Sequence, residues 1–284
     1  MTDQEKNNNP HPGATGLEVR GLTVAYGAQT VLENLSFTLP AGASLAIVGE
    51  SGCGKTTLLT TLAGLLKPCS GTIRWRAADG RDIPRLHSSF VWQGLGLFPW
   101  KTVRENLALP FALRNAVVPK SEGPARVAAM LAELGLKGLE DRWPAQLSGG
   151  QRQRLAPGRA LIADPEVLFM DEPFSALDAL RRERLQDFLA DLRVRRPVTM
   201  IFVTHDIAEA VFLASHVLLL AANPPRLLEL YENPAWVPER QSARRDDPAF
   251  VDAARRVHAE LLGAARRSVG NEPESGTKEE KAAR

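Results

Sequence analysis

The sequence predicts an α/β fold in which a parallel sheet is preceded by antiparallel strands and interrupted by an all-helical insertion. Three observations favour this fold. Short continuous apolar runs, typical of strands buried on both faces, alternate with segments of helical apolar spacing. Residues 17–36 contain two strand-like segments around a turn at Gly27. Residues from about 102 to 163 contain a helical stripe but no clear strand.

The elements of the parallel sheet follow one another along the chain. The run Ser-Leu-Ala-Ile-Val at 44–48 ends in glycine, so we expect a buried strand there and a helix over 54–66. Two further buried strands are expected at 166–170 and 198–203. Apolar residues at helical spacing over 176–195 predict a crossover helix between them.

The remaining segments set the domain limits. In the insertion, a helical stripe that includes Val127 ends at Gly135, a plausible helix C-cap. Near the end of the chain, Asp247 and Pro248 have the character of an N-cap and a first helical residue. Residues 1–16 and 265–284 are polar and are expected to be disordered. The sequence thus predicts one domain over 17–264, with a helical subdomain at about 94–165.

Composition excludes several classes of protein. The 284 residues carry a formal net charge of +2, whereas nucleic-acid-binding proteins typically have a strongly basic surface. Two cysteines make no disulfide framework and fit a reducing cytoplasm. The N-terminus has no apolar core of a secretory signal. The apolar stretch 200–222 is interrupted by His205, Asp206 and Glu209, so we expect a soluble chain that would reach a membrane only by docking on other proteins.

A phosphate-binding loop is predicted between the first buried strand and its helix. The run Gly-Glu-Ser-Gly-Cys-Gly-Lys-Thr matches the P-loop pattern in full. Glycines let the backbone N–H groups converge on phosphate oxygens, and the helix N-terminus adds a positive field. Lys55 is expected to reach the β- and γ-phosphates, and Thr56 to hold Mg²⁺. The residues expected to contact the nucleotide here are Gly49, Glu50, Ser51, Gly52, Cys53, Gly54, Lys55, Thr56 and Thr57.

A second buried strand ends in two adjacent carboxylates, Asp171 and Glu172. Asp171 at the strand tip is positioned to reach Mg²⁺ through water, and Glu172 to polarise an attacking water. An acidic strand end is common at protein surfaces, but its pairing with a P-loop favours nucleotide hydrolysis. Together the two motifs predict a P-loop NTPase (RecA-like) core with an N-terminal antiparallel β subdomain and an inserted α-helical subdomain.

The run Leu-Ser-Gly-Gly-Gln-Arg-Gln-Arg at 147–154 narrows this class, because it resembles the signature motif of ABC ATPases. Ser148 is a good N-cap, and Gly149 and Gly150 leave backbone N–H groups bare at a helix start. The resemblance implies that these residues and Gln151 face the γ-phosphate held by a second subunit. One ATP would thus be clamped between two chains.

Other ABC motifs follow in order. Tyr26 resembles the aromatic residue that stacks on adenine, and Gln93 the Q-loop glutamine that contacts Mg²⁺ or the attacking water. Residues 173–178, ending in Asp178, resemble the D-loop that crosses the dimer interface. His205 resembles the switch histidine that touches the γ-phosphate. The resemblance therefore implies catalytic roles for Glu172, His205, Gln93 and Lys55, and a metal site at Thr56, Gln93 and Asp171.

Within the ABC family the chain resembles importer subunits of the nitrate/sulfonate/taurine group. Leu-Phe-Pro-Trp at 97–100 follows the Q-loop glutamine, as it does in that group. There the region receives a coupling helix of the permease, so Leu97, Phe98 and Trp100 are expected to supply an apolar docking surface or to pack the helical subdomain. About 80 residues follow His205, which leaves no room for the β-rich regulatory domain of sugar and polyamine importers.

The resemblance implies a homodimer with two integral-membrane permease subunits, served indirectly by a solute-binding protein, and no nucleic-acid partner. It places the chain on the cytoplasmic face of the inner membrane as a peripheral subunit. The expected solute is a small anion of the nitrate, sulfonate or taurine type, and the alternatives are related anions and a thiamine-precursor-like solute. The alternatives are a soluble ABC ATPase in nucleic-acid or complex remodelling, and a regulatory subunit that binds ATP without useful hydrolysis.

One departure from the family pattern lies just after the signature, where Pro157 and Gly158 occupy a predicted helix. Proline removes a backbone hydrogen bond at a cost of about 3 kcal/mol, and glycine adds about 1 kcal/mol. We therefore expect slower hydrolysis or weaker ATP-driven dimerisation than in a variant with Pro157→Ile and Gly158→Ala.

Overall fold

The computed structural model of the chain describes residues 15–113, 119–175, 177–196, 198–221 and 226–269. A six-stranded sheet in the order β5-β6-β7-β3-β8-β9 forms its centre. Neighbouring strands in this central sheet are parallel, except for the antiparallel pair β8 and β9. The strands are β3 Ser44–Gly49, β5 Ser88–Val91, β6 Val167–Asp171, β7 Thr199–Val203, β8 His216–Ala221 and β9 Arg226–Glu232.

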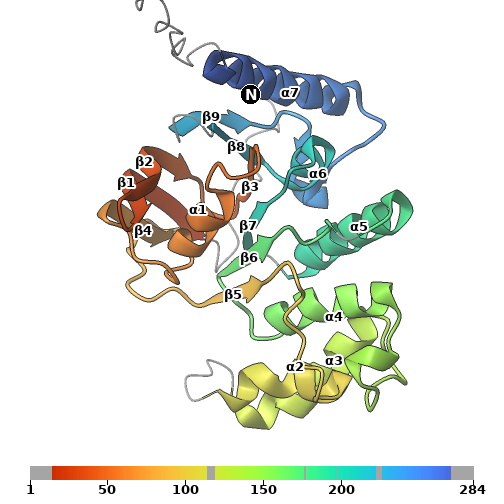
Figure 1. Cartoon of the computed structure of the whole chain (residues 1–284). Coiled ribbons are helices and arrows are strands. Elements are labelled where there is room, and N and C mark those ends of the chain that lie inside the picture. Colours follow the sequence, from red (N-terminus) through yellow and green to blue (C-terminus); the bar gives the residue numbers. More distant parts are fainter. Residues whose placement is uncertain (1–14, 114–118, 176, 197, 222–225, 270–284) are drawn as a thin grey trace, which may run out of the picture.

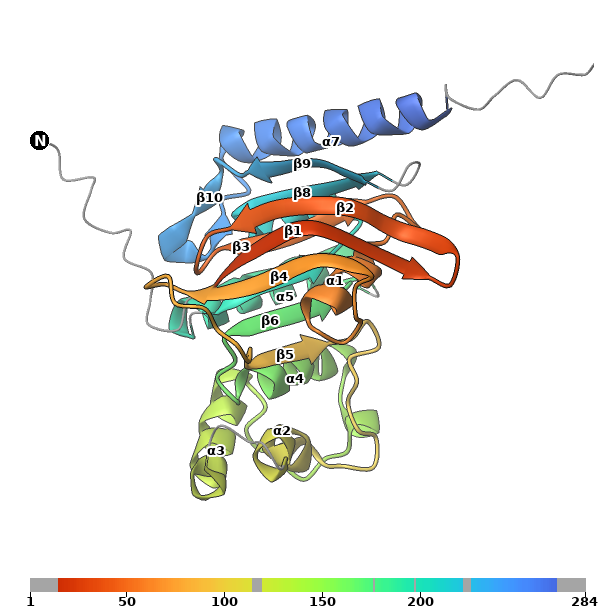
Figure 2. The same cartoon turned by 90° about the vertical axis from the view of Figure 1, so that its left-hand side faces the viewer.

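An antiparallel sheet in the order β2-β1-β4 lies against one face of the central sheet (Figure 2). The turn between β1 and β2 includes Gly27 in a left-handed conformation (φ 59°), as the sequence predicts. The third strand, β4, is not predicted by the sequence. The bounds are β1 Thr15–Tyr26, β2 Gln29–Leu39 and β4 Ser70–Ala77, and the short strands β10 Trp236–Val237 and β11 Ser242–Ala243 form a separate pair.

Helices lie beyond both edges of the central sheet. Figure 1 shows α2, α3 and α4 gathered at one end, beyond β5, and α7 lying along β9 at the other. None of the helices in the described ranges combines the length and the apolar character that a membrane span requires. The bounds are α1 Lys55–Leu62, α2 Val103–Ala112, α3 Gly123–Glu133, α4 Gly149–Leu161, α5 Ala179–Arg195, α6 Ile207–Leu213 and α7 Pro248–Val269, with short 3₁₀ helices η2 Lys120–Glu122, η3 Pro144–Gln146 and η4 Pro238–Arg240.

The inner strands β3, β6 and β7 consist almost entirely of apolar residues, and both of their faces are covered. In β3, Leu45 and Ile47 point into the core shared with α1 and the antiparallel sheet. The alternate residues Ala46 and Val48 point into the core shared with the helices of the other face. This two-sided burial explains why the strand has a continuous run of apolar residues rather than an alternating pattern.

The predicted helical insertion is confirmed, because α2, α3 and α4 are the regular elements between β5 and β6 in the described residues. The limits of the domain are wider than predicted. Thr15 and Gly16 belong to β1, which continues its pairing with β4 to Thr15, and Thr15 also bonds with Thr199. At the other end, α7 runs through Gly263 and on to Val269, because the alanines and arginines that follow this glycine are good helix formers. Residues 1–14 and 270–284 lie outside the described part.

Pro157 does not break its helix, because α4 runs through it from Gly149 to Leu161. Gly158 has a packing role that the sequence does not predict. A Cβ atom on this glycine would lie 2.5 Å from Cδ1 of Leu134, which is fully buried at the end of α3. The glycine therefore allows α4 to approach α3 closely, and this geometry argues against the expected benefit of Gly158→Ala.

We predict that Gly158→Ala lowers the free energy of unfolding by on the order of 1–2 kcal/mol, because overpacking of about 1–3 kcal/mol outweighs the gain in helix propensity of up to about 1 kcal/mol. Thermal or urea unfolding measures the difference. Gly94→Ala is the control, since a Cβ atom there meets nothing within 4 Å. A Gly158→Ala protein as stable as wild type would show that Leu134 moves aside freely.

Candidate ATP-hydrolysis site

The loop between β3 and α1 is bounded by two glycines, Gly49 and Gly54, at which a side chain would require neighbouring atoms to shift. Gly54 is left-handed (φ 94°), and a Cβ atom there would lie 2.8 Å from Cδ2 of Leu32. A Cβ atom on Gly49 would lie 2.5 Å from the carbonyl oxygen of Leu220 in β8. The loop is therefore held close to both its neighbours, with its backbone turned as a phosphate cradle requires.

Lys55 lies inside this loop. Its buried ammonium group donates to the carbonyl oxygens of Gly49 (2.9 Å) and Glu50 (2.8 Å). Cys53 instead turns its buried side chain toward Gly49, and its backbone N–H donates to Glu50 within the loop. Burial raises the pKa of the Cys53 thiol. The side chain of Cys53 thus packs beneath the loop, while Lys55 holds a positive charge at its centre.

We predict that Lys55→Met weakens ATP binding about 10- to 100-fold, since a charged hydrogen bond to phosphate contributes about 1.5–3 kcal/mol. Titration of a fluorescent ATP analogue measures the affinity. Lys67→Met is the control, because this exposed lysine follows the same helix outside the loop. Equal affinities in the two variants would mean that Lys55 does not contact the phosphates.

Thr56 and Asp171 form a pair of oxygen donors at the loop. The hydroxyl of Thr56 donates to Oδ1 of Asp171 at 3.0 Å, which joins the start of α1 to the end of β6. Burial raises the pKa of the Asp171 carboxyl, against the lowering effect of the bond from Thr56. No cluster of three His, Cys, Asp or Glu side chains in the described residues forms an all-protein metal cage. One hydroxyl and one carboxylate fit Mg²⁺, which takes its other ligands from water and phosphates.

Glu172 lies at the centre of a second group of side chains. Nε2 of Gln93 donates to Oε2 of Glu172 at 3.2 Å, and Nδ1 of His205 lies 3.7 Å from the same oxygen. The imidazole of His205 is 61% exposed, so it is open to a ligand. The structure thus brings together three of the predicted catalytic residues from three separate loops.

The backbone at Glu172 is held in an uncommon conformation. Its φ of 44° lies in the left-handed region, which costs a non-glycine residue on the order of 1–3 kcal/mol. Two contacts hold it there: its N–H donates to Val203 in β7, and the hydroxyl of Ser175 donates to its carbonyl. Such strain is typical of functional sites. Here the side chain of Asp171 contacts Thr56, whereas that of Glu172 contacts Gln93.

The remaining predicted residues lie apart from this centre. Ser148 caps α4, accepting from the N–H of Gln151, whose side chain accepts from the N–H of Ser148 in return. Asp178 caps α5 through the N–H of Arg181. Tyr26 is 54% exposed at the end of β1. Ala176, in the predicted D-loop, lies outside the described residues. Ser148 thus caps its helix as predicted, and the contacts of the signature turn, Asp178 and Tyr26 with a nucleotide remain predictions.

Sequence reasoning missed the charged residues behind the site. Arg182, Asp206 and Glu209 form an ion-pair group that connects the start of α5 to the start of α6. The spacing of Asp206 and Glu209 matches an acidic helix start. No local pattern, however, indicates that Arg182 would reach them.

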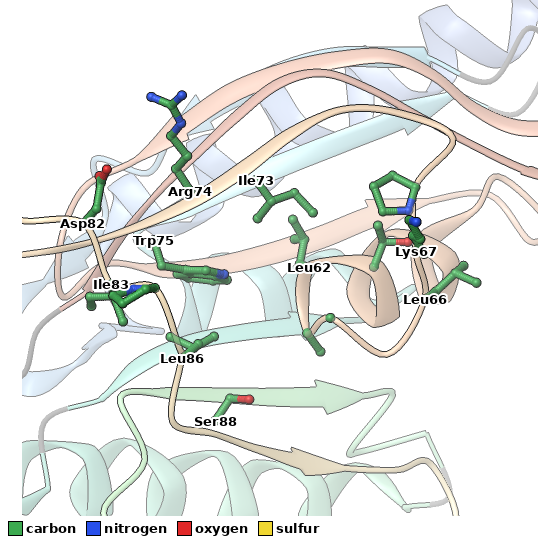
Figure 3. A pocket seen from close by; sticks show the side chains of 15 residues that line it. Leu62, Leu66, Lys67, Ile73, Arg74, Trp75, Asp82, Ile83, Leu86 and Ser88 are labelled. Carbon is green, nitrogen blue, oxygen red and sulfur yellow. The ribbon is translucent and has the colours of Figure 1, made fainter.

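A cavity of about 730 Å³ lies elsewhere in the molecule (Figure 3). It is formed by the end of α1, by β4 and by the segment before β5, with Leu62, Trp75 and Leu86 among its apolar walls. None of the predicted site residues lines it. The phosphate site is therefore identified by the geometry of its loop and not by the size of a cavity.

Comparisons with known proteins agree with this site. The family described as ABC transporter matches residues 32–175. The aliphatic sulfonates import ATP-binding protein SsuB of Bacillus licheniformis is 40% identical over 234 residues, 82% of this chain and 87% of that protein. The taurine import ATP-binding protein TauB of Escherichia coli (strain K12) is 41% identical over 239 residues, 83% of this chain and 92% of that protein.

Two solved structures share the fold. A metal-chelate type ABC transporter in an inward-facing conformation has a TM-score of 0.64 at 30% identity, covering 77% of this chain and 83% of that chain. CbiO1 from Clostridium perfringens, part of the ABC transporter complex cbiONQ, has a TM-score of 0.66 at 27% identity, covering 76% and 88%. The chain therefore belongs to the ABC transporter family, as an ATP-binding and ATP-hydrolysing subunit.

Proposed function

We propose that this chain is the ATPase subunit of an importer for small sulfonate-type anions, taurine among them. The observation that carries the proposal is its identity of 40–42% over more than four fifths of its length to subunits named for sulfonate and taurine import. Thr56, Asp171 and Gln93 would hold Mg²⁺ beside ATP, and that ion neutralises charge on the β- and γ-phosphates. Glu172 would take a proton from the attacking water, with Gln93 and His205 positioned around it.

The site would be completed by a second copy of the chain. Gly149 and Gly150 present the first N–H groups of α4, next to the Ser148 cap in the helical subdomain, whereas the P-loop precedes α1 in the core (Figure 1). In a twofold dimer each signature turn would face the phosphates of the partner. Closure of this dimer on ATP would drive two permease subunits from the cytoplasmic face of the inner membrane, with a solute-binding protein delivering the anion.

The permease would dock beside the Q-loop. Trp100 is 66% exposed, and its ring meets that of Phe98 edge-on, with the ring centroids 5.4 Å apart. The guanidinium carbon of Arg159 lies 5.5 Å from the centroid of the Phe98 ring. Leu97, by contrast, packs against the core. An exposed aromatic side chain on a supported base is typical of a docking surface. Leu97 therefore packs the subdomain, and the exposure of Trp100 supports our assignment of this residue to contact with a coupling helix.

The first test is purification of the tagged chain from native membranes in mild detergent, followed by identification of its partners. A multi-helix permease supports the importer, and recovery of DNA, ribosomes or repair proteins instead would contradict it. Uptake of labelled taurine, an alkanesulfonate and nitrate by cells with and without the gene then identifies the solute. Loss of nitrate uptake alone would overturn the sulfonate assignment.

We predict that Trp100→Ala lowers recovery of the permease at least about fivefold, because an exposed aromatic anchor contributes about 1 kcal/mol or more. Trp143→Ala is the matched control, a 44% exposed tryptophan in the same subdomain. ATP affinity should be unchanged in both variants. Equal recovery of the permease by both would place the docking surface elsewhere.

A further inference from the structure

Arg182 contacts two loops that flank the hydrolysis site, namely the D-loop and the loop that carries His205. It lies in the first turn of α5, just after the D-loop. Its Nη2 donates to the carbonyl of Leu177 in that loop at 3.2 Å, and its Nη1 donates to Oδ2 of Asp206 at 2.7 Å. Asp206 follows His205 directly and caps α6 with its other carboxylate oxygen. One planar guanidinium therefore connects the D-loop to the segment that carries His205.

Glu209 supports the same segment from behind. Its side chain is 6% exposed, and Oε2 accepts from the hydroxyl of Thr204 at 2.5 Å. That hydroxyl accepts in turn from the N–H of Asp206 at 3.0 Å, so the residues on both sides of His205 are tied to Glu209. Oε1 lies 3.4 Å from Nε of Arg182. Nε of Arg182 is buried without a hydrogen bond, so Arg182 and Glu209 are in ion-pair contact but are not hydrogen-bonded to each other.

We propose that Arg182 and Glu209 are positioning residues for ATP hydrolysis, which hold His205 and the D-loop in register with each other. The inference rests on the proposed function, since it takes His205 to act at the γ-phosphate. Glu209 touches neither Glu172 nor the P-loop in any described contact. It acts through Thr204 and Asp206, and its negative charge faces Arg182.

The pKa of the Glu209 carboxyl indicates that this residue does not serve only to stabilise the fold. Burial raises the pKa of its carboxyl from 4.5 to about 7, opposed by the bond from Thr204 and the charge of Arg182, and Asp206 adds to the rise. Among the elements packed on α6, α5 contributes Arg182, whereas β3, β10 and β11 carry no charged side chain. The charged side chains of α7 are exposed where they are described. A charge that remains there near neutral pH is costly to the fold, which favours a functional reason for its presence.

The sign of the pH dependence follows from this pKa. Because the folded-state pKa lies above 4.5, the contribution of Glu209 to stability is fully present below pH 4.5 and is lost as the pH rises through about 7. Glu209→Gln removes the charge and keeps the shape. It is therefore expected to raise the melting temperature at pH 8, with the difference shrinking toward pH 5, while it weakens the hold on Arg182.

The test compares kcat, KM for ATP and melting temperature of the full chain for wild type, Glu209→Gln and Arg182→Lys. At pH 8 we expect kcat to fall about fivefold or more in both variants with KM nearly unchanged. The ratio of wild-type to Glu209→Gln kcat should be smaller at pH 6 than at pH 8, because a pKa of about 7 leaves more of the wild-type Glu209 protonated at the lower pH. Glu183→Gln and Arg184→Lys, exposed residues of the same helix, serve as controls and should behave as wild type.

A fall in melting temperature and kcat together in Glu209→Gln would mark a structural ion pair and overturn the proposal. An unchanged kcat, or a ratio that is constant between pH 6 and pH 8, would also overturn it. These results are distinct from failure of the proposed function. If wild type itself does not hydrolyse ATP, or does so without any dependence on Glu172, the hydrolysis mechanism is wrong and this role falls with it.

Discussion

The Glu172→Gln protein is expected to bind ATP normally and to hydrolyse it at least about 100-fold more slowly than wild type. The amide keeps the volume of the carboxylate, and its oxygen still accepts the bond from Gln93 seen at 3.2 Å. What it loses is the proton acceptor for the attacking water, and general-base catalysis contributes about 10²–10⁴-fold. Because ATP is then bound but not consumed, the closed dimer should accumulate. Steady-state phosphate release and gel filtration with and without ATP measure the two effects.

Two controls make this result decisive. Glu183→Gln changes an exposed carboxylate on α5 and should leave turnover and dimerisation unaltered. The affinity of the Glu172→Gln protein for ATP should equal that of wild type. Equal affinities would show that the strained turn at residue 172 is intact in the variant. Turnover retained in Glu172→Gln would mean that another group takes the proton, and loss of ATP binding would mean that this carboxylate supports the fold of the site.

The sequence predicts the motifs because each depends on local chemistry. The P-loop needs glycines at positions that approach Leu32 and Leu220, and these glycines appear in the sequence although the contacts do not. The buried strands β3, β6 and β7 are covered on both faces, so their continuous apolar runs are visible. The strand β4 alternates arginine with apolar residues and escaped notice, because only one of its faces is buried.

What the sequence does not predict depends on contacts between distant segments. In the sequence, Gly158 only weakens a predicted helix. The structure shows that Leu134, 24 positions earlier, packs against this glycine. The group of Arg182 and Glu209 forms because α5 and α6 start side by side at the end of neighbouring strands, a fact of sheet order. The strained φ of Glu172 likewise requires Val203 and Ser175 to be in place. Local patterns thus indicate which residues react, and tertiary packing decides how they are held.

Mixing two inactive variants is expected to restore ATP hydrolysis if the site is shared between two copies of the chain. In Lys55→Met the P-loop is defective and the signature turn is intact. In Ser148→Asp the P-loop is intact, but a negative charge stands where the partner's γ-phosphate would lie. Aspartate caps helices as well as serine does, so α4 should keep its structure. Each variant alone should have at most about 1% of wild-type turnover, because both shared sites are damaged.

In an equal mixture about half of the dimers contain one chain of each kind. Such a dimer has one site that combines Lys55 of one chain with Ser148 of the other, and a second site that lacks both. If the intact site works alone, the mixture should recover about a quarter of wild-type turnover. Ala145→Asp, an exposed position just before the signature, is the control for the added charge and should remain active. A site completed within one chain gives no recovery on mixing, since every chain then carries a damaged site, and that outcome would exclude the shared arrangement.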